Sequence, residues 1–81
     1  MKAIVHVNES SGFHARPATV FVQRATQFAC AVAVCAHGRT ANGKSLLNLI
    51  ALGAKSGDEL TIETSGDDEA KALKALVELF N

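Results

Sequence analysis

The residues with the clearest capacity for chemistry stand in the run Gly12-Phe13-His14-Ala15-Arg16-Pro17-Ala18. Pro17 is expected in the first turn of a helix, because its missing N–H would be unpaired there in any case. That places His14 at or near the N-cap, beside the free backbone N–H groups of Ala15 and Arg16. A helix N-terminus binds anions, and the guanidinium of Arg16 is suited to phosphate. The pattern predicts a histidine beside a phosphate-binding cradle.

The same helix start bears on the charge of the His14 ring. The positive end of a helix disfavours an imidazolium, so we expect a neutral, nucleophilic ring near pH 7. Spacing alone leaves a second interpretation open. In it, His14 is a solvent-exposed histidine at a helix start, with an unrelated arginine two residues later.

Ser45 is the second residue of chemical interest. It precedes Leu46 and Leu47, and Gly53 follows, which predicts a short helix with a serine N-cap and a glycine stop. The cap alone contributes about 1 kcal/mol. Lys44, Leu46 and Leu47 add positive charge and apolar surface beside the serine, which suits a docking partner. Ser45 is therefore either a helix cap only or a cap that is also a regulatory site.

The elements that must position these residues follow from the spacing of apolar side chains. Alternating or β-branched runs predict four strands, at residues 2–8, 31–36, 39–42 and 59–64. Apolar residues at helical spacing predict three helices, at residues 17–28, 46–52 and 67–80. The order β-α-β-β-α-β-α predicts an α/β (α+β) two-layer sandwich. Three helices would cover one face of a four-stranded, largely antiparallel sheet.

Length and composition limit the alternatives. The 81 residues allow one domain, residues 1–81, and make a conventional large-pocket enzyme a poor hypothesis. A hydrophobic share of 48% argues against a disordered tail, while the absence of Trp and Tyr argues against stacking on single-stranded nucleic acid. We expect no metal site, since no ligand cluster is evident. We also expect a soluble, cytoplasmic protein without membrane insertion, because no run of about 18 apolar residues occurs.

The charges cancel overall but not along the chain. Residues 1–57 carry six basic side chains and one acidic, whereas residues 58–81 carry two basic and seven acidic. If the fold separates these segments, a basic face would suit an acidic protein partner. The alternative is ordinary surface charge that interleaves after folding.

The two cysteines and two of the three histidines invite simpler interpretations. Cys30 and Cys35 are too few for a disulfide framework, and along a strand they would lie about 16 Å apart on opposite faces. That exceeds disulfide reach, so we expect free thiols in a reducing compartment. His6 is expected on a strand face and His37 in a turn, neither with a functional role.

Three stretches of the sequence resemble one family. Gly12-Phe13-His14-Ala15-Arg16-Pro17-Ala18 resembles the active-site motif of the HPr family, the histidine phosphocarriers of the bacterial phosphoenolpyruvate:sugar phosphotransferase system. Asn42-Gly43-Lys44-Ser45-Leu46-Leu47 resembles the regulatory serine motif of that family, and the likeness continues from Leu52 to Ile62. The resemblance spans essentially the whole chain, and the family's open-faced β-sandwich has the predicted order of elements.

The resemblance implies a mechanism. His14 would receive a phosphoryl group on Nδ1 from phospho-enzyme I and pass it to enzyme IIA domains. Arg16 and the backbone N–H groups of the first turn would stabilise the group during transfer. The protein would be a monomeric carrier rather than an enzyme, and would need no metal or cofactor. Contacts with partners are expected from Phe13, Pro17, Lys44, Leu46 and Leu47.

For Ser45, the resemblance implies phosphorylation by HPr kinase/phosphorylase and recognition by a catabolite-control transcription regulator. The alternative function is a regulatory paralogue, of catabolite repression or of a nitrogen-type phosphotransferase pathway, that acts mainly as a binding module. A ferredoxin-like module for nucleic acid or metal fits the composition poorly. Departures from the family pattern are Asn48, the two cysteines and an early end at Asn81, which would shorten the last helix.

Overall fold

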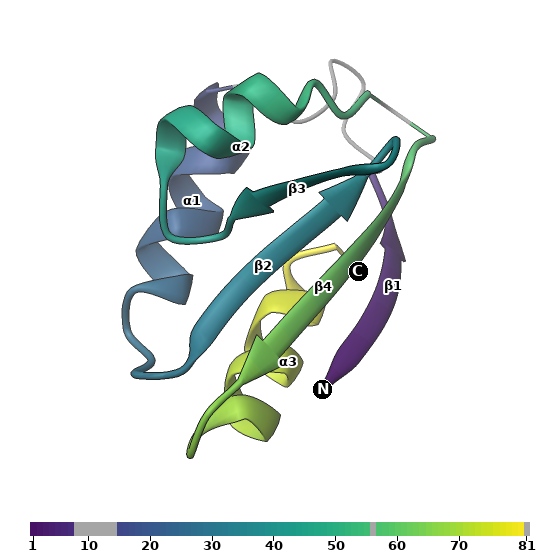
Figure 1. Cartoon of the computed structure of the whole chain (residues 1–81). Coiled ribbons are helices and arrows are strands. Elements are labelled where there is room, and N and C mark those ends of the chain that lie inside the picture. Colours follow the sequence, from purple (N-terminus) through teal and green to yellow (C-terminus); the bar gives the residue numbers. More distant parts are fainter. Residues whose placement is uncertain (8–14, 56, 81) are drawn as a thin grey trace.

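The computed structural model describes residues 1–7, 15–55 and 57–80, and for Ala15, Arg16 and Pro17 it describes the backbone. Within these residues the elements follow in the predicted order: β1 Lys2–His6, α1 Ala15–Ala25, β2 Ala31–Ala36, β3 Arg39–Asn42, α2 Leu46–Leu52, β4 Glu59–Ser65 and α3 Glu69–Glu78. Figure 1 shows the strands in one sheet with α3 behind it and α1 and α2 packed together beside β3. The prediction of a two-layer fold is confirmed.

The four strands form one sheet in the order β1-β4-β2-β3, and every neighbouring pair is antiparallel. β4 lies between the other two long strands, with Leu60 opposite Val5 of β1 and Ile62 opposite Val34 of β2. Val34 also faces Ala41 of β3. Because side chains alternate along a strand, this register puts the buried residues Val5, Val34, Ala41, Leu60 and Ile62 on the same face.

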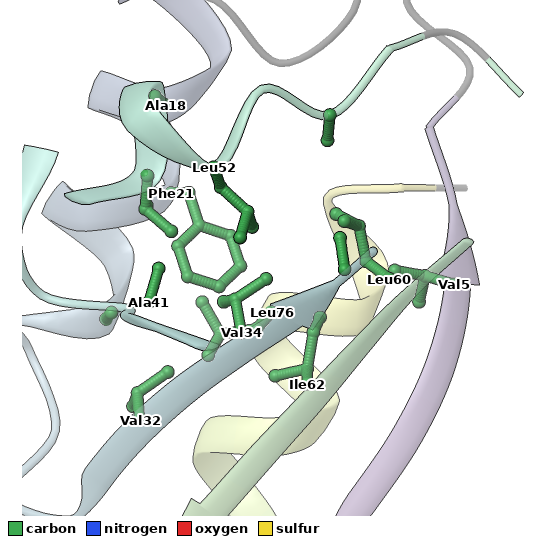
Figure 2. Packing of buried hydrophobic residues seen from close by; sticks show 14 of the residues in the cluster. Val5, Ala18, Phe21, Val32, Val34, Ala41, Leu52, Leu60, Ile62 and Leu76 are labelled. Atoms are coloured by element: carbon green, nitrogen blue, oxygen red, sulfur yellow. The ribbon is translucent and has the colours of Figure 1, made fainter. Parts of the chain in front are cut away.

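The core lies between that face and the helices. Its largest fully buried apolar side chains come from α1, α2, β4, α3 and β2: Phe21, Leu49, Leu60, Ile62, Leu76 and Val34. Figure 2 shows the Phe21 ring beside Leu52. The ring points toward Val34 of β2 and toward Leu76 of α3. The Phe21 ring meets Phe80 edge to face with 6.2 Å between centroids, a favourable aromatic geometry.

The opposite face of the sheet carries polar and small side chains. Its β1 residues Lys2, Ile4 and His6 are exposed, and Ile4 keeps 61% of its surface in solvent. Thr61 of β4 faces Ile4 on one side and Cys35 on the other. The sheet is therefore an open-faced sandwich, as the sequence predicts.

The bounds of α2 are as predicted, whereas α1 begins two residues earlier and ends three residues earlier than predicted, and α3 is two residues shorter at each end. The helix predicted to reach residue 28 ends at Ala25, although Phe28 still packs against the core. Gln27 N–H donates to Arg24 O and Phe28 N–H to Ala25 O, so the chain tightens into bonds between residues three apart. Such a last turn continues the apolar spacing without continuing the α-helix, which is why periodicity alone overextends it.

Candidate functional site

The second part of the histidine motif, from Ala15 to Ala18, lies at the start of α1. Phe13 and His14 lie outside the described residues, and α1 begins at Ala15. His14 therefore directly precedes the first helical residue in the chain, and the backbones of Arg16 and Pro17 belong to the first turn. Helical N–H groups of a first turn have no partner within their own helix. The start of α1 thus lies where the sequence predicts it, and the binding of an anion by its amides stays a prediction.

Ser45 is the N-cap of α2, as predicted. Its backbone is extended, with φ −116° and ψ 113°, and its Oγ accepts from Asn48 N–H at 3.3 Å. Gly53 ends the helix in the left-handed conformation at φ 72° and donates its N–H to Ile50 O. Both ends of this short helix are therefore satisfied by local groups.

The side chain of Asn48 adds a contact that the sequence analysis missed. Its Nδ2 donates to Ser45 Oγ at 2.9 Å, so this oxygen accepts two hydrogen bonds from one residue. A hydroxyl oxygen has two acceptor lone pairs, so both are occupied. The spacing of Ser45 and Asn48 is that of a capping box, with an amide at the position where Glu or Gln is usual, and it could have signalled the contact.

The docking residues predicted around Ser45 differ in exposure. Leu47 is 79% exposed, whereas Leu46 is half-buried and packs against the core. Lys44 is also half-buried, and its ammonium donates to the main-chain carbonyl of Phe28 at 2.6 Å. Leu47 is thus available to a partner, while Lys44 is already joined to the segment that follows α1.

Exposed apolar side chains on the two packed helices extend beyond the predicted set. Val20 of α1 is 48% exposed and Ile50 of α2 is 39% exposed. The sequence analysis did not single out Val20, because its place in the helical repeat does not show which face remains outside the core. Together with Leu47, these residues give α1 and α2 apolar surface of the kind that binds partners.

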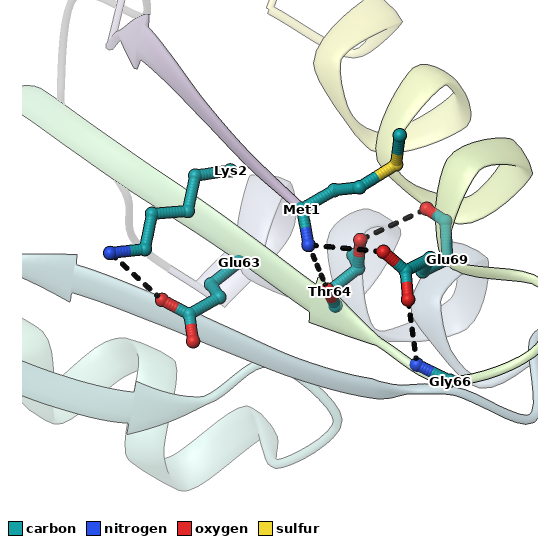
Figure 3. A network of polar contacts seen from close by, with 6 residues as sticks. All are labelled: Met1, Lys2, Glu63, Thr64, Gly66 and Glu69. Atoms are coloured by element: carbon teal, nitrogen blue, oxygen red, sulfur yellow. Dashed lines mark hydrogen bonds and ion pairs between the residues drawn. The ribbon is translucent and has the colours of Figure 1, made fainter.

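The open face of the sheet bears on whether the basic and acidic segments of the chain form separate faces or share one. Lys2 Nζ lies 3.6 Å from Glu63, and His6 Nε2 lies 3.8 Å from Glu59. The N-terminal ammonium contacts Glu69 at 3.3 Å and also donates to Thr64 O (Figure 3). On this face Lys2, from the basic first half of the chain, therefore lies beside Glu63 of the acidic second half.

Asp68 joins the start of α3 to the start of β2. Its carboxylate does not cap its own helix but accepts from Ala29 N–H at 2.8 Å and Cys30 N–H at 2.9 Å. The bond from Ala29 N–H is the main cause that lowers the pKa of Asp68. Burial, followed by the neighbouring Asp68, raises the pKa of the Cys30 thiol. Cys30 and Cys35 are both free thiols, as expected, and the raised pKa of the buried Cys30 disfavours the thiolate, which is the nucleophilic form.

Other kinds of site are absent from the described part of the chain. Residues 1–7, 15–55 and 57–80 contain no group of three or more His, Cys, Asp or Glu side chains placed to share a metal ion. Over the same residues, no helix has the length and apolar character that crossing a bilayer requires.

Comparison with known proteins identifies the family. The family model described as "PTS HPr component phosphorylation site" matches residues 1–81. The phosphocarrier protein HPr of Neisseria meningitidis serogroup A is 38% identical over 81 residues, which cover all of this chain and 91% of that protein. The crystal structure of HPr from Thermoanaerobacter tengcongensis superimposes with a TM-score of 0.95 at 35% identity, covering 99% of this chain and 90% of that one.

A second kind of relative also appears. The catabolite repression containing protein Crh of Bacillus subtilis superimposes with a TM-score of 0.80 at 37% identity, covering 94% of this chain and 87% of that one. Its crystal structure is described as a dimer with a swapped domain. Since the family model and the HPr relatives match along the whole sequence, the chain belongs to the HPr family of phosphocarrier proteins of the phosphotransferase system, which carry a phosphoryl group and are not enzymes.

Proposed function

We propose that this protein relays a phosphoryl group from phospho-enzyme I to enzyme IIA domains through His14. The observation that carries the proposal is the start of α1 at Ala15, directly after His14, in a chain that matches a phosphorylation-site family model over residues 1–81. In the first step, a bond forms between His14 Nδ1 and phosphorus while the N–P bond of the donor breaks. In the second step, the His14 N–P bond breaks as the acceptor forms its own.

The residues after His14 supply the electrostatics of this transfer. The backbone N–H groups of Ala15 and Arg16 lie in the first turn of α1, where donors have no helical partner. We assign to them the phosphoryl oxygens, and to the Arg16 guanidinium the charge that develops during transfer. Donors held in place before the reaction stabilise that charge without reorganising.

We assign docking to a surface formed by Phe13, Pro17, Lys44, Leu46 and Leu47. Of these residues, Leu47 has the strongest structural support, because 79% of its surface is exposed. Lys44 contributes charge at the edge of this surface while its ammonium stays on Phe28 O. We expect the protein to work as a monomer in the cytoplasm, and sedimentation at working concentration would distinguish this from a dimer like that of Crh.

Substitution of His14 tests the relay. His14→Ala should abolish labelling by enzyme I and phosphoenolpyruvate, because no other atom would hold the transferred group. His6→Ala is the matched control, since His6 is an exposed histidine on the open sheet face. Intact mass should show one acid-labile phosphate on wild type and on the control. Labelling of His14→Ala at the wild-type level would assign the phosphate to another residue.

Regulation at Ser45 is the second part of the proposal, and a Crh-like binding module is the alternative function. A kinase of the HPr kinase/phosphorylase type would place a charge of roughly −1.5 to −2 at the start of α2. A catabolite-control regulator would then read the modified surface. The charge falls beside Lys44 and Leu47, where it would repel an acidic partner but suit the helix dipole.

Two variants of Ser45 distinguish the effect of added negative charge from the effect of losing the N-cap. Ser45→Asp should slow acceptance of phosphate from enzyme I at low salt, and added salt should narrow the difference from wild type. Ser45→Ala removes the cap without adding charge, so it should accept phosphate at the wild-type rate. Equal rates for Ser45→Asp and wild type at low salt would leave Ser45 as a cap only. A wild-type protein that accepts no phosphate at all would favour the binding module.

A further inference from the structure

The backbone on either side of Ser45 is held by hydrogen bonds. Lys44 N–H donates to the side-chain oxygen Oδ1 of Asn42 at 2.9 Å. Ser45 N–H donates to Asn42 O at 3.0 Å, and Leu49 N–H donates to Ser45 O at 3.1 Å. The first two bonds close the turn that leads out of β3, and the third begins the hydrogen-bond ladder of α2. The position of Ser45 is therefore set by its main chain.

The Ser45 hydroxyl accepts two hydrogen bonds of different kinds. The bond from Asn48 N–H at 3.3 Å comes from the helix backbone, so it lasts as long as Ser45 caps α2. The bond from Asn48 Nδ2 at 2.9 Å is shorter and comes from a side chain that can rotate. Of the two donors, the side-chain amide is therefore the one that can leave Ser45 Oγ while the helix stays intact.

Asn48 has open space beside it. The residue is exposed and borders a groove of about 440 Å³ between β3 and α2, whose walls include Thr40 and Ala51. The net contribution of a hydrogen bond at an exposed position is small, because water replaces the lost partner. The amide of Asn48 can thus exchange Ser45 Oγ for water at low cost.

Phosphorylation of a serine requires a lone pair on its hydroxyl oxygen. Oγ attacks the terminal phosphorus of ATP, the bond from that phosphorus to ADP breaks, and the hydroxyl proton passes to a base of the kinase. In this protein both lone pairs of Ser45 Oγ accept hydrogen bonds from Asn48. At least one of these bonds must break before Oγ can attack.

We propose that Asn48 is a positioning residue that restrains Ser45: its side-chain amide occupies a lone pair of Oγ and must turn away before the serine can be phosphorylated. The inference rests on the proposed phosphorylation of Ser45. Asn48 is one of the departures from the HPr pattern, so the restraint is a property of this chain. In this account Asn48 touches neither ATP nor the transferred phosphoryl group, and it acts through the hydroxyl of Ser45.

The test compares two variants of Asn48 with a control at the other end of α2. Asn48→Ala removes the side-chain donor. Asn48→Asp keeps the shape, but its carboxylate accepts a hydrogen bond from the Ser45 hydroxyl instead of donating one. Gly53→Ala loosens the same helix through the strain of a left-handed alanine and leaves the contact of Asn48 with Ser45 in place. Each protein is incubated with ATP and a kinase of the HPr kinase/phosphorylase type. Intact mass counts the phosphate, and Ser45→Ala is the blank.

We expect Asn48→Ala to raise kcat/KM for phosphorylation of Ser45 about two- to tenfold, which is the factor that one such hydrogen bond supplies. Asn48→Asp should show the same rise at high salt, where its added charge is screened, and Gly53→Ala should match wild type. A wild-type rate in Asn48→Ala would overturn the proposal. An equal rise in Gly53→Ala would also overturn it, since a loosened helix would then be the cause. So would a rise in Asn48→Ala without one in Asn48→Asp, because the bulk of the side chain would then restrain the serine.

The outcomes keep this inference apart from the proposed regulation. Phosphorylation of Asn48→Ala but not of wild type would support the restraint and refute regulation at Ser45 of the natural chain. Phosphorylation of both proteins at the same rate would support regulation at Ser45 and overturn the restraint. If neither protein is phosphorylated, both proposals are refuted.

Discussion

The two ends of the sheet are built differently. The Ser45 end comprises Met1, residues 28–31, residues 42–45 and residues 64–66, and the Val7 end comprises residues 6–7, 36–39 and 57–59. At the Ser45 end, four separate charged groups bind main-chain atoms: Asp68 binds Ala29 and Cys30, Lys44 binds Phe28, the N-terminal ammonium binds Thr64, and Glu69 binds Gly66. At the Val7 end, the charged contact to the main chain is made by Asp58.

Packing is also tighter at the Ser45 end than at the Val7 end. A Cβ on Gly66 would lie 2.9 Å from Cys30 Cα, which is closer than atoms can approach. A Cβ on Gly57 would meet no atom within 4 Å among the residues that the structure describes, its chain neighbours aside. The Ser45 end is therefore closed by backbone packing, while the Val7 end, which leads toward His14, has space around its turn. Among the described residues, the tighter packing thus lies at the Ser45 end of the sheet.

The same substitution at both glycines gives the largest expected effect. Gly66→Ala should lower the free energy of unfolding by about 3 kcal/mol or more, because φ 141° is a glycine conformation and the new methyl meets Cys30. Gly57→Ala should cost only about 1–2 kcal/mol, the strain of a left-handed alanine. Urea unfolding of the two variants measures both. Equal losses would mean that the two ends are packed alike.

Acid should act more strongly on the Ser45 end. The pKa values of Asp68 and Asp58 are both lowered by main-chain N–H groups, so each contributes stability above the ordinary carboxyl pKa of about 4. That stability is lost as the pH falls through the lowered value, when the folded protein takes up the proton. Asp68 accepts two main-chain N–H groups and Asp58 accepts one.

Thermal melts between pH 2 and 7 test this difference. Asp68→Asn should lower the Tm at pH 7 and flatten its decline in acid more than Asp58→Asn does. Asp58→Asn can keep the one oxygen that accepts from Lys55 N–H, whereas Asp68→Asn loses one of its two acceptor oxygens, so the comparison covers charge and hydrogen bonding together. A steeper acid decline for Asp58→Asn would reverse the assignment of the ends.

The smallest effect concerns the cap at the Ser45 end. Asn48→Ala removes one of the two hydrogen bonds to Ser45 Oγ and should cost about 0.5–1 kcal/mol in the free energy of unfolding. Asn48→Asp is the matched variant, since a carboxylate of the same shape can accept but not donate to Ser45. If Asn48→Ala is as stable as wild type while Ser45→Ala is destabilised, the backbone bond alone makes the cap.

Local features of the fold could be predicted from the sequence. The Ser45 cap and the Gly53 stop lie within one helix, and the alternation of Leu60 and Ile62 appears directly in the chain. Each depends on neighbours a few residues away, where residue type and spacing fix the geometry. The predicted order of elements and antiparallel sheet are confirmed for the same reason.

Contacts between distant segments could not be predicted in this way. Asp68 lies 39 residues from Ala29, and His37 lies 21 residues from Asp58. Both contacts depend on which strand ends meet, and therefore on the β1-β4-β2-β3 order, which the periodicity of one chain does not specify. Acid before α3 predicts a helix dipole effect, but the Asp68 carboxylate is instead used across the fold.

The open face of the sheet has a consequence for how the sequence can change over evolutionary time. Along β4, Leu60, Ile62 and Thr64 are packed beneath helices, while Glu59 is exposed and Thr61 and Glu63 are half-exposed. The exposed residue at every second strand position should thus tolerate most substitutions. The buried residues between them should be restricted to side chains of similar volume. Lineages could diverge at half of their strand positions and still keep one backbone.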